Sequence, residues 1–191
     1  MKKLLKTLLL TAMMICMGAS LVFAASNADK ETLQEGADIS SIHRLAIGSP
    51  LYTPAGEKPP TKDELTQAIF DGSKAARMYV ISYPQAAQSI AADTGTDITA
   101  LDRRQAAKIF KDNIGKYADA YVIVTVANDS RTVFFYDVYK ASTNDLLYTY
   151  QIVAEKSQKN SVEGYRDMSK EFYKHFEAAA NKKAKEDSKK K

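Results

Sequence analysis

Few side chains in this sequence could carry out catalysis or hold a metal ion. The two histidines, His43 and His175, do not form a pair at the spacing that a zinc site needs. The single cysteine, Cys16, lies close to the amino terminus. Asp137 is the one acid in an otherwise apolar strand sequence. It could be functional if buried, but we expect an edge strand or a partner such as Arg131 to explain it. These residues predict no catalytic centre and no metal site.

The motifs that usually mark enzymes and nucleic-acid binders are also missing. The chain has no glycine-rich phosphate loop and no nucleophile elbow. Its net charge of +4 falls to +1 without the first 24 residues, because 27 basic residues become 24 against 23 acidic ones. A nearly neutral domain is not a broadly basic nucleic-acid binder. We therefore expect no cofactor and no nucleic-acid partner. A hydrolase with an unrecognised acid-based site is the remote alternative.

Residues 1–24 have the pattern of an export signal. Three lysines are followed by an apolar run from Leu8 to Val22, and the small residue Ala24 ends the segment. We expect cleavage between Ala24 and Ala25 and a periplasmic or secreted mature chain. An uncleaved membrane anchor is the alternative, although the apolar run is shorter than the roughly 20 residues that span a bilayer comfortably.

Cys16 does not match a lipid-attachment site. Ile15 occupies a position where a small residue is needed, and further apolar sequence follows the cysteine. Cleavage after Ala24 would leave a mature chain without cysteine, so disulfides, thiol catalysis and cysteine-bound metals are excluded for the exported form.

The rest of the chain divides into a polar leader, one domain and a basic tail. Residues 25–40 are polar and show no clear period, so we expect a leader. Residues 41–180 alternate strand-like and helix-like segments and form the expected domain. Residues 181–191 contain six lysines and no apolar face. We expect this tail to make, at most, a weak electrostatic contact with an anionic envelope surface.

The domain has the pattern of an α/β fold. A capping box at Thr61 and Glu64 begins the first helix, and short turn clusters separate the last three strands. We expect a single domain with a mixed sheet of about five strands, ending in an antiparallel meander and flanked by about four helices. The expected strands are 42–48, 78–82, 120–127, 132–141 and 146–154, and the expected helices are 62–76, 84–92, 98–115 and 161–180.

Tyrosine is abundant in the last three strands, and it suits either a half-covered sheet or a contact surface. The candidate interaction surface therefore combines two strand residues with the chain end: Tyr148, Tyr150, Lys189, Lys190 and Lys191.

The order of these elements resembles a group of bacterial envelope α/β modules. The resemblance rests on Leu45-Ala46-Ile47, Met78-Tyr79-Val80-Ile81-Ser82-Tyr83-Pro84-Gln85, Ala118-Asp119-Ala120-Tyr121-Val122-Ile123 and Ser142-Thr143-Asn144-Asp145-Leu146-Leu147. The group includes the amino-terminal domain of the translocation protein TolB, the curli secretion protein CsgG and the penicillin-binding-protein activator LpoB. The chain departs from it by lacking a lipid-attachment motif and by carrying Asn144 where a turn glycine is usual.

That resemblance implies an envelope protein that works by binding other proteins, and it transfers no catalytic residue. We therefore expect an exported, non-enzymatic accessory protein with an envelope protein as its partner. The alternative is a small-molecule or cell-wall-binding module that uses the proline-rich loop 49–60 and the sheet edge.

Overall fold

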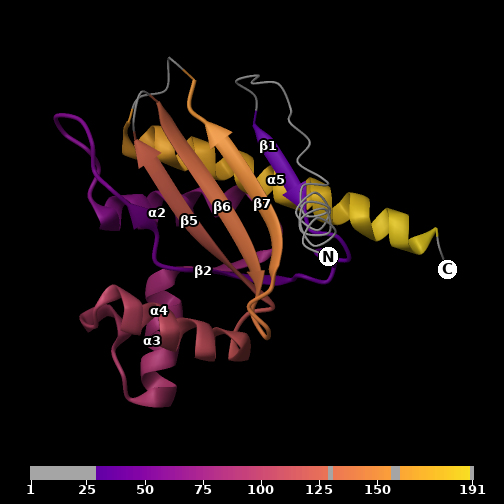
Figure 1. Ribbon diagram of the computed structural model, residues 1–191, viewed down its shortest axis with the longest axis horizontal. Coiled ribbons are helices and arrows are strands. Elements are labelled where there is room, and N and C mark those ends of the chain that lie inside the picture. The colour runs from indigo at the N-terminus through magenta and orange to yellow at the C-terminus, as the bar shows by residue number, and fades with distance from the viewer. Residues whose placement is uncertain (1–28, 129–130, 156–159, 190–191) are drawn as a thin grey trace, which may run out of the picture.

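One mixed seven-stranded sheet organises the protein. The computed structural model describes residues 29–128, 131–155 and 160–189, so the predicted signal peptide 1–24 and its cleavage site at Ala24 and Ala25 lie outside the described residues. The strand order is β1-β7-β6-β5-β2-β4, and β3 pairs with β5 off this path (Figure 1). The strands are β1 (Lys30–Leu33), β2 (Arg44–Ile47), β3 (Leu51–Tyr52), β4 (Tyr79–Ile81), β5 (Ala120–Asn128), β6 (Thr132–Lys140) and β7 (Leu146–Val153).

The sheet is parallel at one side and antiparallel at the other. β2 runs parallel to both β4 and β5, and β3 runs parallel to β5. β5, β6, β7 and β1 are successively antiparallel. The parallel pairs arise because α-helical crossovers connect β2 to β4 and β4 to β5, whereas short turns connect the last strands. The α/β fold and the carboxy-terminal meander predicted from the sequence are confirmed.

Two helix layers cover the sheet unequally. The helices are α2 (Lys62–Gly72), α3 (Tyr83–Thr94), α4 (Arg103–Asn113) and α5 (Val162–Ser188), with short 3-10 helices η2 (Ser73–Ala75), η3 (Ile98–Ala100) and η4 (Ile114–Lys116). Figure 1 shows α5 and α2 behind β5, β6 and β7, whereas α3 and α4 are grouped at the end where β5 begins. The two layers form separate cores, one under α2 and α5 and a smaller one under α3 and α4.

Side-chain caps fix where the helices begin. Thr61 and Glu64 form the predicted capping box at the start of α2. α5 is capped by Ser161, whose hydroxyl accepts from the Gly164 amide. The Asn160 side-chain amide donates to the Ala55 carbonyl oxygen and ties the start of α5 to the proline-rich loop.

The structure contains elements that the sequence analysis did not predict. β1 lies within the range expected to be a polar leader, and its four side chains are all exposed, so its place depends on backbone pairing with β7. The helix predicted over 98–115 is broken, because Leu101 is extended and the Asp102 side chain caps a new helix at Arg103. α5 continues past residue 180 to Ser188 and projects beyond the sheet (Figure 1).

The core under α5 is largely aromatic. Tyr136 of β6 stacks on Phe172 with ring centroids 4.1 Å apart, and Tyr148 of β7 meets Phe176 edge-on at 5.2 Å. Each of these four side chains is fully buried. The polar face of the long helix is turned to solvent, so α5 is anchored by this aromatic stripe.

Candidate interaction face

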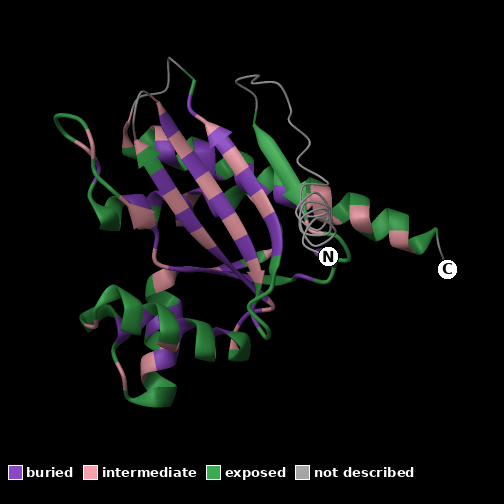
Figure 2. Ribbon diagram, viewed as in Figure 1, coloured by how far each residue is buried: buried purple, intermediate pink, exposed green. Residues whose placement is uncertain are grey.

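One face of the meander is not covered by any helix among the described residues. The strands alternate, so that every second residue of β6 is buried under α5 while the residues between them are half-buried on the other side. Figure 2 shows these half-buried positions as pink bands that alternate with purple ones along β6. We call this surface the open face. It consists of Ile123, Thr125, Val133, Phe135, Asp137, Thr149, Gln151 and Val153.

The pairing register arranges the open face in rows across the strands. Thr125 of β5, Phe135 of β6 and Gln151 of β7 lie opposite one another in the central row. Val133 and Val153 form an apolar pair on one side of that row. Phe135 is thus at the centre, with apolar and hydrogen-bonding side chains around it. That mixture is typical of the surface of a non-obligate protein interface.

Asp137 lies on the same face, in the row on the other side of Phe135. It is paired across the strands with Ile123 and Thr149, and its Oδ1 accepts a hydrogen bond of 2.9 Å from the Thr149 hydroxyl. β6 is an internal strand of the sheet, so the prediction of an edge position is wrong, and the partner shown is Thr149 rather than Arg131. The carboxylate is half-buried beside an apolar centre, where it would favour a partner that offers a donor or a positive charge.

The lower end of this sheet face is closed by α4. Phe110 of α4 packs edge-on against Tyr121 at 5.7 Å, and Tyr121 stacks on Tyr139 at 5.2 Å. The Lys111 ammonium lies 5.9 Å from the centre of the Tyr139 ring. Burial, with the charge of Asp137 adding to it, raises the pKa of Tyr139 above its ordinary value. Ile123 still packs against the core under α3 and α4, so it marks the boundary of the open face on this side.

The two tyrosines predicted as part of an interaction surface point to the opposite side of the sheet. Tyr148 is 0% exposed and Tyr150 is 1% exposed, because α5 covers both rings. The Tyr150 ring stacks on His175 at 4.8 Å, and its hydroxyl donates to Asp29. These rings cannot contact a partner while α5 is in place. Burial is the main reason that the pKa of both hydroxyls is raised.

The predicted basic residues follow α5 in the sequence. Lys189 is exposed and follows the last helical residue, whereas Lys190 and Lys191 lie outside the described residues. Lys183 is 22% exposed on its side chain and pairs with Asp187 at 3.0 Å, which raises the lysine pKa. The end of α5, to which Lys183 belongs and which Lys189 follows, projects away from the open face (Figure 1).

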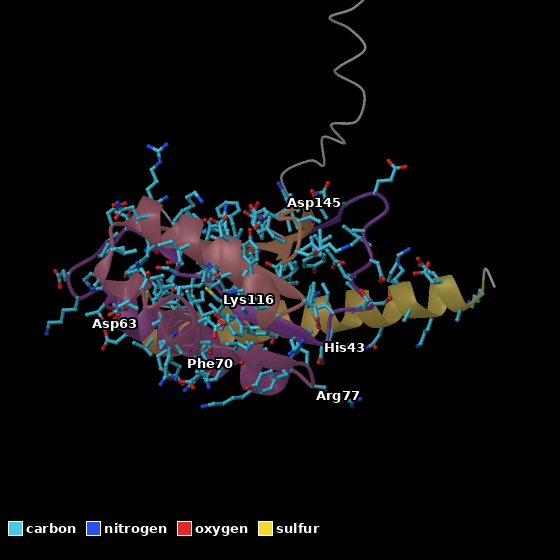
Figure 3. All side chains as sticks on the ribbon, turned by 90° about the horizontal axis from the view of Figure 1, so that it is seen from below. His43, Asp63, Phe70, Arg77, Lys116 and Asp145 are labelled. Carbon is cyan, nitrogen blue, oxygen red and sulfur yellow. The ribbon has the colours of Figure 1, made fainter. Side chains whose placement is uncertain are left out.

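The structure places the two histidines on different elements. His43 precedes β2, where its backbone amide donates to Asp119, and in Figure 3 it lies near Arg77. His175 lies in α5, where the neighbouring Lys174 forms an ion pair with Glu171 at 2.8 Å. Within residues 29–128, 131–155 and 160–189, no group of three or more potential metal ligands is found. No helix in that part of the chain is long and apolar enough to cross a membrane.

The open face was not identified from the sequence. The alternation along β5 and β6 was visible, but both faces of these strands carry apolar residues. The signal that could have indicated it is the polar set opposite the tyrosines of β7, namely Thr149 and Gln151.

The sequence matches no protein-family model, and no curated protein matches it. Solved structures to which this chain shows a likeness include the LpoB C-terminal domain from Escherichia coli, at 13% identity, 64% coverage of this chain, 88% coverage of that chain and a TM-score of 0.47. The PelC dodecamer from Paraburkholderia phytofirmans gives 11% identity, coverages of 76% and 94% and a TM-score of 0.41. Lipoprotein GNA1162 from Neisseria meningitidis gives 17% identity, coverages of 74% and 96% and a TM-score of 0.36.

The likeness to the LpoB domain agrees in part with the resemblance noted in the sequence, and the resemblance to TolB and CsgG stays a prediction. Because the TM-scores are low, the function proposed below rests on this chain's own residues.

Proposed function

We propose that the chain is an exported, non-enzymatic accessory protein of the bacterial envelope that binds a protein partner through the open face. The observation that carries this proposal is Phe135, a half-buried aromatic residue at the centre of a sheet face that no described helix covers. Aromatic side chains at the centre of a patch supply much of the binding energy of protein interfaces. The surrounding threonine, glutamine and aspartate side chains supply the polar contacts that give such an interface its specificity.

The experiment compares two Gln→Arg variants of the full mature chain in the native cell. Gln151→Arg adds bulk and charge to the central row of the open face without removing an apolar side chain. Gln88→Arg makes the same change at an exposed position of α3. The partner complex is measured by crosslinking in cells and by its elution with the chain in size-exclusion chromatography.

We expect Gln151→Arg to lose the complex and Gln88→Arg to retain it, with both variants keeping the wild-type melting temperature. Phe135→Ala provides a second variant, which removes the central ring without adding charge. A complex that survives both changes at the open face would contradict the proposal.

The basic end of α5 supports a second, weaker contact with an anionic envelope surface. Lys182, Lys185 and Lys189 are exposed on a helix that projects beyond the sheet. Each lysine near an anionic membrane contributes at most about 1 kcal/mol, and salt weakens the contact. Co-sedimentation with phosphatidylglycerol vesicles should fall when these three residues are changed to glutamate. Equal sedimentation of the wild type and this variant would refute a role for the tail in binding.

A further inference from the structure

A cleft of about 460 Å³ lies where the parallel strands end, away from the centre of the open face. Ser49 lies two residues after the end of β2 and Tyr83 two residues after the end of β4, and both line the cleft. After β2 the chain continues to α2 on one side of the sheet. After β4 it continues to α3 and α4 on the other side. In sheets of this kind, such a crevice at the carboxyl ends of parallel strands is a common place for ligands.

The wall of the cleft is mainly apolar. Phe110 and Ile98 belong to the buried core at 3% and 1% exposure, whereas Leu101 and Ile123 are half-buried and leave apolar surface open to the cleft. The apolar lining is completed by Leu51, Ala106 and Ala107. A cavity of this volume with such a wall is suited to the apolar body of a small molecule.

The rim of the cleft carries more positive than negative charge. Lys62, Arg103 and Lys111 line it against a single acid, Asp63, and all four are exposed. Within the part of the chain that the structure describes, Lys62 and Arg103 form no ion pair, and Lys111 has the face of the Tyr139 ring as its neighbour. Three cations are therefore available for an anionic group.

Side-chain caps already bond part of the helix-start amides at this end of the molecule, which leaves the charged side chains as the main groups that attract an anion. The first turns of α2, α3 and α4 all border the cleft, but the side chains of Thr61, Ser82 and Asp102 already accept from their amides. The preference for an anion depends mainly on the lysine and arginine side chains.

Tyr83 adds a hydrogen-bond donor to the wall. Burial raises the pKa of Tyr83, the charge of Asp97 raises it further, and a hydrogen bond with Ser49 opposes the shift. Its hydroxyl is therefore protonated at neutral pH and can donate to a ligand oxygen.

We propose that this cleft binds a small amphipathic anion, whose apolar or aromatic body lies against Leu101, Phe110 and Ile123 and whose acidic group faces the cations of the rim. This inference goes beyond the proposed partner binding, because the cleft shares only Ile123 with the open face. In Figure 3, Asp63 on the rim lies at the end of the molecule opposite the projecting end of α5, so the cleft is also separate from the basic tail.

The test uses two fluorescent probes with related apolar bodies and the full mature chain. The anionic probe is 8-anilinonaphthalene-1-sulfonate, and the neutral probe, N-phenyl-1-naphthylamine, lacks the sulfonate. We expect saturable binding of the anionic probe at one site, and weaker binding of the neutral one. The double variant Arg103→Gln/Lys111→Gln should lower the affinity for the anionic probe by about three- to tenfold, because it removes about two partly screened ion pairs. The same double variant should leave the affinity for the neutral probe unchanged.

Two further variants place the bound probe. Ala107→Trp fills the cleft from an exposed position of α4 and should abolish binding of both probes. Gln151→Arg on the open face should change neither affinity. Lys108→Gln, an exposed lysine of the same helix outside the cleft lining, is the matched control for the charge variant.

The proposal is overturned if Ala107→Trp binds the anionic probe as the wild type does, or if the rim variant loses no more affinity than Lys108→Gln. It is also overturned if Gln151→Arg alters binding of the anionic probe as strongly as the rim variant does, because the site would then be the open face. Thermal melts show that each variant is folded, since partly folded proteins bind this dye non-specifically.

Discussion

The hydrogen bond between Tyr136 of β6 and Ser169 of α5 should show strong energetic coupling between sheet and helix. Both side chains are 0% exposed, and their oxygens are 2.9 Å apart. The single hydroxyl hydrogen of Ser169 is directed at the Tyr165 carbonyl oxygen at 2.8 Å, so Tyr136 must be the donor to Ser169. The pKa of Tyr136 is raised well above its ordinary value, mainly by burial, so this donor is protonated at the neutral pH of the measurement.

The three variants of a double-mutant cycle should therefore differ in a definite order. Ser169→Ala leaves the buried Tyr136 hydroxyl without an acceptor, which costs about 1–3 kcal/mol. Part of this loss, about 0.5 kcal/mol, is offset because alanine favours the helix more than serine does. Tyr136→Phe keeps the ring stacked on Phe172 and leaves Ser169 bonded to Tyr165, so it should cost only about 0.5–1.5 kcal/mol.

The double variant contains no stranded hydroxyl and should be no less stable than Ser169→Ala alone. The coupling energy is then at least the cost of Tyr136→Phe, about 0.5–1.5 kcal/mol, and so exceeds the roughly 0.3–0.5 kcal/mol by which independent sites depart from additivity. Urea unfolding followed by circular dichroism at neutral pH measures all four free energies. Tyr139→Phe, on the opposite face of the sheet, is the control and should be additive with Ser169→Ala. Additive effects of Tyr136→Phe and Ser169→Ala would refute this account of the contact.

Three other predictions concern the packing, the pH dependence and the amino terminus. Gly72→Ala should destabilise the fold by about 1–3 kcal/mol, seen as a lower melting temperature, because a Cβ there would meet the Ser169 Cβ at 2.6 Å and the backbone of α5 at 2.8 Å. Burial raises the pKa of Tyr117 and Tyr121 to about 12, so the free energy of unfolding should be constant up to about pH 9 and fall as the pH rises through about 10 towards 12. The free energy of unfolding falls because the unfolded chain loses these phenolic protons at a lower pH than the folded chain does. Equal urea midpoints at about pH 8 and about pH 11 would contradict this predicted fall. Amino-terminal sequencing of the exported protein should begin at Ala25, and a retained initiator methionine there would rule out cleavage.

The local elements of this protein could be predicted from the sequence because their causes are local. The capping box of Thr61 and Glu64 satisfies backbone donors within one helical turn, so it is visible in four consecutive residues. The valines of β5 and the turns on either side of β6 indicate a buried strand in a meander, since strand alternation has a period of two residues. A glycine-rich phosphate loop and a nucleophile elbow are also short local patterns, so the sequence was enough to show that neither motif is present.

Several features depended on contacts between distant segments, and the sequence could not reveal them. β1 carries four exposed side chains, so it has no apolar pattern, and only its backbone pairing with β7 makes it a strand. The break in the helix predicted over 98–115 is a different case, because the Asp102 side chain accepts from the amides of Arg104 and Gln105, and the sequence carried this local signal.

The location of the interaction surface was likewise decided by tertiary structure. Alternation along β7 separates Tyr148 and Tyr150 from Thr149 and Gln151, but it does not say which set a helix will cover. The aromatic stripe of α5 selects the tyrosine side, because burying large rings removes more apolar surface from water than burying threonine and glutamine would. By itself, the sequence determined two chemically different faces of the meander. Only the packing of α5 decided that the face around Phe135 stays open.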